Sequence, residues 1–208
     1  DGIFLTHAHI GHYTGLMYLG HEALASRQTN VYAMPGMKTF LTGNGPWSQL
    51  VKFENIELLE LQNDSTIRLS SNLTIKPFLV PHRDEYSETV GYKITGPKKE
   101  VLFIPDINKW DVWDRSIVDE IKKVDYALLD ATFFDGAEIN HRDIREIPHP
   151  FVIESMLLFE SLPMQERDKI HFIHFNHTNP LLNSESKQTK KVEEAGYNVS
   201  RFLQVIEL

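Results

Sequence analysis

The sequence predicts an α/β fold in a single domain over residues 1–208, with its chemistry at one rim of the sheets. Short apolar segments bounded by polar turns recur along the chain, as is typical of strands. Segments with apolar residues at helical spacing separate several of them. Histidine or aspartate stands where several of these strands end, and polar side chains at strand ends are typical of functional sites in α/β proteins.

The composition is that of an ordinary globular protein, with 41% hydrophobic and 24% charged residues and a net charge of -8. No basic stripe stands out, so an extended nucleic-acid surface is not expected. We expect a small-molecule substrate instead. The chain has no cysteine, so disulfides and thiolate metal sites are excluded. A metal site would therefore rely mainly on His, Asp or Glu.

No apolar run reaches the roughly 18 residues of a membrane span, and no signal peptide is visible, so we expect a soluble protein. The chain begins without Met and enters a strand at once. We therefore expect that residue 1 is not the natural start and that earlier strands precede it. Compartment and oligomeric state are not indicated.

The first twelve residues carry a strand that ends in a cluster of histidines. The apolar run at 3–5 leads to His7 and His9, which in an extended segment point the same way. His12 follows where the chain turns into a predicted helix. Neutral imidazole is a common zinc ligand, so this cluster predicts a metal site. The alternative is a set of surface histidines on a loop.

The remaining elements follow from apolar periodicity and from turn residues. The Pro-Gly pair at 35–36 predicts a helix start, and Gly196 predicts a helix end. We expect helices at about 14–27, 35–42, 111–123, 151–161 and 187–195, and strands at 30–34, 56–61, 65–68, 73–80, 89–94, 100–105, 125–133, 169–175 and within 197–208. A loop is expected over 135–150.

Four polar residues stand at or just past the ends of later strands. His82 follows the strand at 73–80, and Asp106 follows the one at 100–105. A carboxylate at the end of a buried strand needs a partner, either a metal or the start of a helix that it caps. Asp130 lies near the end of the strand at 125–133. In the strand at 169–175 both faces are apolar, so the strand-end location alone favours His174 over His171, which we expect to be packed or edge-exposed.

In this order, the residues resemble the metallo-β-lactamase superfamily, whose signature is His-x-His-x-Asp-His after a strand, then a lone His, a bridging Asp and a last His. The first motif matches, except at one position, the segment Thr6-His7-Ala8-His9-Ile10-Gly11-His12. His82 is similar to the lone His, Asp106 to the bridging Asp and His174 to the last His. The resemblance implies an αββα sandwich that lacks its N-terminal strands here.

Two further segments narrow the resemblance. The segment 129–133, Leu-Asp-Ala-Thr-Phe, is similar to the His-Glu-Ala-Thr segment of tRNase Z-like phosphodiesterases. The segments 173–182 and 194–197 are more similar to the B protein of pyrroloquinoline quinone biosynthesis. Within the superfamily, the chain therefore resembles these two groups of proteins most.

The resemblance implies a ligand set. His7, His9 and His82 would hold one metal. His12 and His174 would hold a second, and Asp106 would bridge the two. Asp130 would orient His174 through its ring N–H. Zinc, one or two ions per chain, is the expected metal, and the ligand types also allow Fe or Mn.

Gly11 replaces the family's aspartate, which ligates the second metal and often handles protons. The second site is therefore left with three protein ligands. The proton donor to a leaving group must also come from elsewhere, and the candidates are Asp84, His149 and His177. We favour His149, which Pro148 and Pro150 place rigidly, and the alternative is that it is a solvent-exposed loop histidine.

Three functions are compatible with these residues. The first is a metal-dependent hydrolase, in which a metal-bound water attacks an ester or phosphoester and Asp106 belongs to the catalytic centre. The second, implied by the quinone-biosynthesis likeness, is an iron-dependent oxygenase of a small aromatic substrate. The third is a non-catalytic metal- or ligand-binding module.

Overall fold

The computed structural model describes residues 2–138 and 147–208. Part of the loop predicted at 135–150, with His141, lies outside these ranges. The chain divides into two compact units. The first comprises Asp1–Ser65, Pro77–Leu79 and Arg83–Val90, and the second comprises Thr66–Lys76, Val80–His82 and Gly91–Leu208. The prediction of a single domain stays a prediction.

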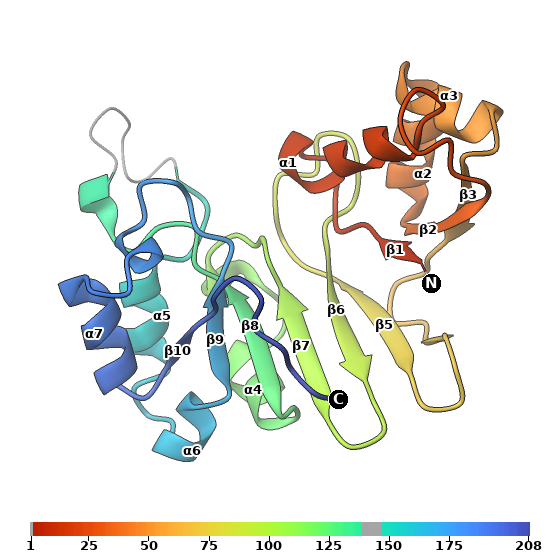
Figure 1. Cartoon of the computed structure of the whole chain (residues 1–208). Coiled ribbons are helices and arrows are strands. Elements are labelled where there is room, and N and C mark those ends of the chain that lie inside the picture. The colour runs from red at the N-terminus through yellow and green to blue at the C-terminus, as the bar shows by residue number, and fades with distance from the viewer. Residues whose placement is uncertain (1, 139–146) are drawn as a thin grey trace. The chain divides into compact units, whose positions relative to one another are not determined.

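The first unit is built on a three-stranded parallel sheet in the order β1-β2-β3 (Figure 1). The central strand pairs Val31 with Ile3 on one side and with Leu58 on the other. Pro35 occupies the first turn of the following helix, where its missing N–H costs nothing. The elements are β1 (Ile3–Phe4), α1 (Ile10–Tyr13), the 3₁₀ helix η1 (Thr14–Leu19), β2 (Thr29–Ala33), α2 (Pro35–Gly43), α3 (Trp47–Lys52) and β3 (Ile56–Glu60).

The core of the first unit gathers apolar side chains from β2, α2, α3 and the segment after β1. Leu5, Val31, Met37 and Leu41 are all buried in one cluster. The predicted helix at about 14–27 is wrong in extent, because the 3₁₀ helix η1 ends at Leu19 and the next residue, Gly20, has an extended backbone. The prediction also missed α3, which begins at Trp47 shortly after α2 ends at Gly43.

The second unit is built on a seven-stranded mixed sheet in the order β10-β9-β8-β7-β6-β5-β4. Strands β7, β8, β9 and β10 run parallel, whereas β6 pairs antiparallel with β7, and β4 with β5. Parallel strands have their carboxyl ends at one edge of the sheet. The strands are β4 (Ile67–Arg68), β5 (Thr74–Leu79), β6 (Val90–Thr95), β7 (Glu100–Ile104), β8 (Tyr126–Asp130), β9 (Ile170–Ile173) and β10 (Asn198–Val199).

Short helices accompany this sheet, and serine side chains cap two of them. Ser116 accepts a hydrogen bond from Asp119 N at the start of α4, and Ser186 accepts one from Thr189 N at the start of α7. The cap at Ser116 divides the helix predicted at 111–123 into two pieces. The helices are η2 (Trp110–Val112), α4 (Ile117–Lys122), η3 (Gly136–Glu138), α5 (Val152–Leu158), α6 (Met164–Arg167), η5 (Pro180–Leu182) and α7 (Lys187–Glu194).

The central strands of this sheet are apolar on both faces. Ile104, Leu129 and Phe172 are completely buried, so apolar packing holds β7, β8 and β9 in place. His171, on β9, is 7% exposed, which confirms that it is packed.

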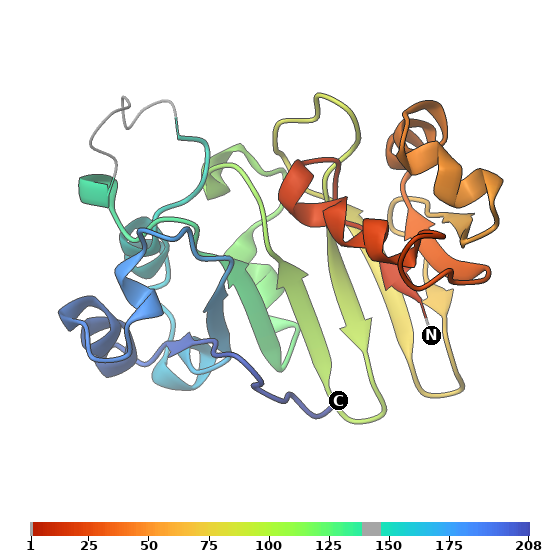
Figure 2. The same cartoon turned by 45° about the horizontal axis from the view of Figure 1, so that its top comes forward.

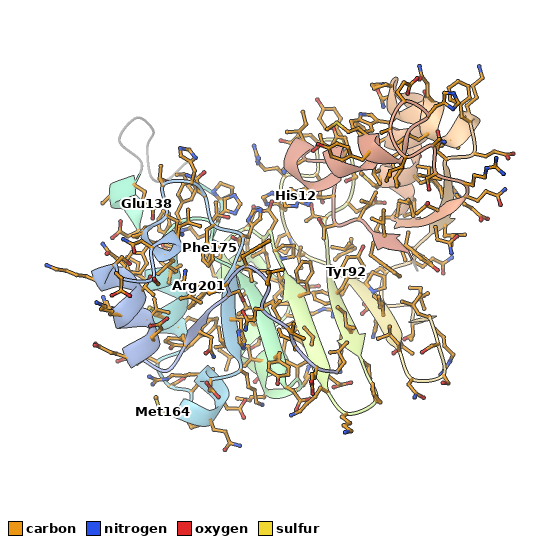
Figure 3. The ribbon with its side chains drawn as sticks, viewed as in Figure 1. His12, Tyr92, Glu138, Met164, Phe175 and Arg201 are labelled. Atoms are coloured by element: carbon orange, nitrogen blue, oxygen red, sulfur yellow. The ribbon has the colours of Figure 1, made fainter. Side chains whose placement is uncertain are left out.

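After β10 the chain forms no further strand. The C-terminal segment runs from β10 to the turn between β6 and β7, where Leu208 meets Gly96 (Figure 2). Arg201, labelled in Figure 3, donates a hydrogen bond from Nη1 to Leu181 O at 2.6 Å near the start of this segment. Within residues 2–138 and 147–208, no helix combines the length and apolar character that a bilayer crossing requires.

Candidate metal centre

In the first unit, the histidines predicted after β1 gather around His7. The ring centroid of His7 lies 4.5 Å from that of His9 and 4.2 Å from that of His12. His7 is only 1% exposed, and its Nδ1 lies 3.1 Å from Thr6 Oγ1. The alternative of surface histidines on a loop does not fit a buried His7.

The backbone of this histidine segment is bound from both sides. Leu5 N donates to Tyr32 O, which extends the pairing with β2 by one residue beyond β1. On the other side, Ala8 N donates to the buried Ser87 Oγ at 2.8 Å, and Val90 N donates to Thr6 O at 3.1 Å. The histidines are therefore attached to a constrained backbone.

Sequence reasoning missed one neighbour of this cluster. His9 Nε2 lies 2.9 Å from Glu85 Oε2, and that hydrogen bond lowers the pKa of the exposed Glu85 carboxyl. Gly11, in α1, is exposed, and a Cβ built there would meet nothing within 4 Å. The position therefore has room for the carboxylate that the family motif places there.

In the second unit, the polar residues predicted at strand ends meet where β7, β8 and β9 finish. His82 Nε2 lies 3.3 Å from Asp106 Oδ1, and the side chain of His82 is completely buried. The other ring nitrogen of His82, Nδ1, lies 3.2 Å from Asn108 Oδ1. Asn108 N in turn donates to Pro81 O at 2.7 Å, so the segments that carry His82 and Asp106 are tied together.

His149 enters the same cluster from the loop before α5. Its Nδ1 lies 2.8 Å from Asp130 Oδ2 and 3.1 Å from Asp106 Oδ1. Asp106, Asp130 and His149 each offer one ligand atom within 4.8 Å of the others. The backbone N–H of Ile107 also donates to Asp130 Oδ2, at 3.2 Å. His149 is thus held between two buried carboxylates.

His174 follows β9 directly and has a backbone φ of 62°, in the left-handed region that side chains other than glycine rarely adopt. Its Nδ1 lies 2.9 Å from Thr132 Oγ1 and 3.5 Å from Asp130 Oδ1. Asp130 is therefore beside His174, as predicted, but Thr132 lies nearer to the ring nitrogen. Phe175, labelled in Figure 3, marks the loop that continues from this point.

The charges in this cluster favour an ionised carboxylate. Burial raises the pKa of Asp130, but hydrogen bonds and charges from His149 and His174 outweigh burial and lower it below its usual value. Burial lowers the pKa of both histidines, whereas the bond to Asp130 and the charges of Asp130 and Asp106 outweigh it and raise the pKa above the usual value. The histidines and the carboxylates stabilise each other's charged forms.

The two other proton-donor candidates are both exposed. Asp84 belongs to the first unit, is exposed, and accepts a hydrogen bond from Thr89 Oγ1 at 2.8 Å. His177 is exposed in the loop after β9. Among the described histidines of the second unit, His149 is the one within 3 Å of Asp130.

The donor set fits a divalent metal. Imidazole and carboxylate are the groups that Zn, Fe and Mn take from a protein without thiolates. The first unit offers the buried imidazole of His7 with two partly exposed ones beside it, and the second offers the buried imidazole of His82 beside the buried carboxylate of Asp106. A buried carboxylate among histidines is the arrangement expected of a ligand with the partners that orient it.

Comparison with known proteins identifies the family. A family model described as the beta-lactamase superfamily domain matches residues 1–175. The coenzyme PQQ synthesis protein B of Nitrosococcus oceani is 26% identical over 232 residues, which span 96% of this chain and 71% of that protein. The relative of the same name from Gluconobacter oxydans is 26% identical, and the match spans 64% of this chain and 47% of that protein.

Solved structures share the fold. Zn(2+)-bound PqqB from Methylobacterium extorquens is 20% identical with a TM-score of 0.79, covering 100% of this chain and 71% of that one. Igni18, a metallo hydrolase from Ignicoccus hospitalis, is 16% identical with a TM-score of 0.61, covering 97% and 76%. CmlA, a diiron β-hydroxylase from Streptomyces venezuelae, is 13% identical with a TM-score of 0.59, covering 97% and 43%.

These findings confirm the predicted fold class, a mixed α/β metallo-β-lactamase fold. At these identities the structural likeness concerns the fold and carries no activity with it. The chain belongs to the metallo-β-lactamase superfamily, close to the pyrroloquinoline quinone biosynthesis B protein.

Proposed function

We propose that this protein is a metal-dependent hydrolase of an ester or phosphoester in a small molecule. The observation that carries the proposal is His149, whose Nδ1 lies between the buried carboxylates of Asp106 and Asp130. A histidine held in this way beside candidate ligands supplies the proton transfer that hydrolysis needs. A metallo hydrolase with the same fold is an example of this architecture carrying such a reaction.

The proposed ligands are those that the family motif places on this chain, namely His7, His9, His12, His82, Asp106 and His174. Zinc is the metal we propose, as in the related Zn(2+)-bound PqqB, at one or two ions per chain. A metal in such a site lowers the pKa of a bound water to about 7 and stabilises charge on the substrate oxygen. With no carboxylate at Gly11, the second ion is the weaker of the two.

The chain's own residues then handle the leaving group. Asp130 accepts the hydrogen bond from His149 Nδ1, which orients the ring and leaves Nε2 as the atom that gives its proton to the departing oxygen. Asp130 also stabilises the charged imidazole before the transfer. General-acid help of this kind is worth about 10²- to 10⁴-fold in rate.

The test compares His149→Ala with His177→Ala, which removes the exposed candidate. Protein stripped with a chelator and reloaded with Zn would be assayed on aryl phosphodiesters and aryl esters with a graded series of leaving groups. We expect His149→Ala to lose about 10²- to 10⁴-fold on poor leaving groups and much less on p-nitrophenolate, which needs no proton. His177→Ala should resemble wild type, and the metal content of both variants should be unchanged. Absence of metal-dependent turnover across the panel would reject the proposal.

The alternative function is an iron-dependent oxygenation of a small aromatic molecule. The observation that favours it is that the relatives are coenzyme PQQ synthesis proteins B, and a diiron β-hydroxylase is an example of the same fold carrying oxidative chemistry. Anaerobic purification followed by elemental analysis separates the two. Stoichiometric iron, with dioxygen uptake that depends on an added aromatic substrate, would favour the oxygenase, and tightly bound zinc would favour the hydrolase. Metal binding without either turnover would indicate a non-catalytic module.

A further inference from the structure

The hydroxyl of Thr132 lies at the junction of three polar groups at the end of β8. Its Oγ1 lies 2.6 Å from Asp130 Oδ1, 2.9 Å from His174 Nδ1 and 3.2 Å from His149 Nδ1. The backbone N–H of Thr132 also donates to Asp130 Oδ1, at 2.9 Å. The family resemblance implies an orienting role for Asp130 and none for the threonine two residues later.

The directions of these hydrogen bonds follow from what each group can offer. Both oxygens of Asp130 accept backbone N–H groups, Oδ1 from Thr132 and Oδ2 from Ile107, so the carboxylate is an acceptor and the single hydroxyl proton of Thr132 goes to it at 2.6 Å. The Thr132 oxygen is then left as an acceptor. His174 must therefore donate from Nδ1, which leaves the lone pair of its neutral ring on Nε2.

His149 does not compete for this acceptor. Its Nδ1 lies 2.8 Å from Asp130 Oδ2, against 3.2 Å from Thr132 Oγ1, so its N–H goes to the carboxylate. The two oxygens of Asp130 are thus divided, with Oδ2 serving His149 and Oδ1 serving Thr132. The Thr132 hydroxyl thus links the carboxylate to His174, because it donates to Asp130 Oδ1 and accepts from His174 Nδ1.

Thr132 also binds the backbone on the far side of His174. Its carbonyl accepts hydrogen bonds from Asn176 N at 3.0 Å and from Asn179 Nδ2 at 3.3 Å. The neighbouring Ala131 N donates to Ile173 O at 2.9 Å, just before His174. The left-handed backbone of His174 is therefore held on both sides by residues 131 and 132, and its ring is held by the Thr132 hydroxyl.

We infer that Thr132 is the positioning residue that fixes the ring orientation and the tautomer of His174, and so presents Nε2 to the metal. The inference rests on the metal-ligand role of His174 in the proposed function. It assigns to the Thr132 hydroxyl the orienting role that the family resemblance gives to Asp130, with Asp130 acting through it. A threonine that served only to pack the loop would need its methyl group and not its hydroxyl.

The test compares Thr132→Val, which keeps the shape but loses the hydroxyl, with Thr132→Ser, which keeps the hydroxyl. Thr178→Val, at an exposed threonine of the adjacent loop, is the control. Zinc affinity would be measured by competition with a chelator of known affinity. We expect Thr132→Val to bind zinc about 10- to 100-fold more weakly, the usual cost of losing a ligand's hydrogen-bond partner, and Thr132→Ser and Thr178→Val to bind as wild type does.

A second measurement does not depend on how well a variant folds. Long-range ¹H–¹⁵N NMR of the ¹⁵N-histidine-labelled wild type, recorded at a pH high enough for the His174 ring to be neutral, reports the tautomer of that ring, and we expect Nδ1–H. An Nε2–H tautomer, unchanged zinc affinity in Thr132→Val, or equal losses in Thr132→Val and Thr132→Ser would overturn the inference. Neither measurement uses turnover. A protein that hydrolyses nothing, but whose zinc affinity depends on the Thr132 hydroxyl, would contradict the proposed function and leave this inference standing.

Discussion

His149 Nδ1 lies 2.8 Å from Asp130 Oδ2, and the carboxylate that it meets is completely buried. Burial alone raises the pKa of a carboxyl, yet the pKa of Asp130 is lowered because His149 and His174 bind to it. The same contacts raise the pKa of His149 against the effect of its own burial. Asp130 and His149 therefore stabilise each other's charged forms.

Asp130→Asn is expected to lower the pKa of His149 in the metal-free protein. The variant keeps the shape of the side chain but removes the hydrogen-bonded charge of Asp130, so the charge of Asp106 alone then opposes the effect of burial on the pKa of the ring. An NMR titration of the His149 ring protons in wild type and variant measures the change. An unchanged or higher pKa in the variant would contradict the assignment of Asp130 as the main cause of the raised value.

Gly11→Asp is expected to strengthen binding of a second metal ion. The position is open, so the new side chain meets no obstacle, and it restores the carboxylate of the family motif. We expect roughly a 10- to 100-fold gain, the size of effect that a change around a ligand produces. Titration with elemental analysis of the bound metal measures it. Gly15→Asp, at another open glycine, adds the same charge outside the motif and should bind metal as wild type does.

His174→Asn is expected to separate metal binding from stability. Asparagine tolerates the left-handed backbone at this position, whereas alanine does so at a cost of about 1–2 kcal/mol. Both variants should lose metal affinity, but in urea unfolding of the metal-free protein only His174→Ala should fall well below wild type. Equal destabilisation of the two variants would show that the imidazole, rather than the backbone, sets the stability of the loop.

His171 is expected to make the protein less stable in mild acid. Burial lowers its pKa in the folded state, partly opposed by the charge of Asp168, and its Nδ1 lies 3.2 Å from Gln204 Nε2. The unfolded chain then binds the proton more readily, so the stabilising contribution is present above about pH 6.5 and is lost as pH falls through the lower, folded pKa. Urea unfolding of metal-free wild type and His171→Gln at pH 7 and pH 5 tests this. The variant should lose less stability between the two, and identical losses would exclude the effect.

The sequence was sufficient for the features that depend on local pattern. Apolar runs predicted the strands that became β7, β8 and β9, and residues just past strand ends lie together at the carboxyl edge of a parallel sheet. Asp106, Asp130 and His174 could therefore be placed from spacing alone. The left-handed backbone at His174 could not be predicted, because it depends on hydrogen bonds from residues about forty positions away.

Partners that come from distant segments were missed for the same reason. Glu85 lies beside His9, and Thr132 lies beside His174, through contacts that span 76 and 42 positions in the chain. Neither residue type by itself predicts a contact with a candidate metal ligand, since an exposed glutamate and a threonine after a strand are common. The helix predicted at about 14–27 is too long because it rested on apolar spacing alone, whereas in the structure the helical backbone stops before Gly20.

Asn179, which is 2% exposed, donates hydrogen bonds to the carbonyls of Ala131 and Thr132 and accepts one from Leu181 N. The turn that carries His174 is therefore held by a few hydrogen bonds, whereas the strands beside it are held by the packing of many buried apolar side chains. On heating, such a turn opens before the strands separate. The protein is then expected to release its metal and lose activity several degrees below its melting temperature, and to regain both on cooling.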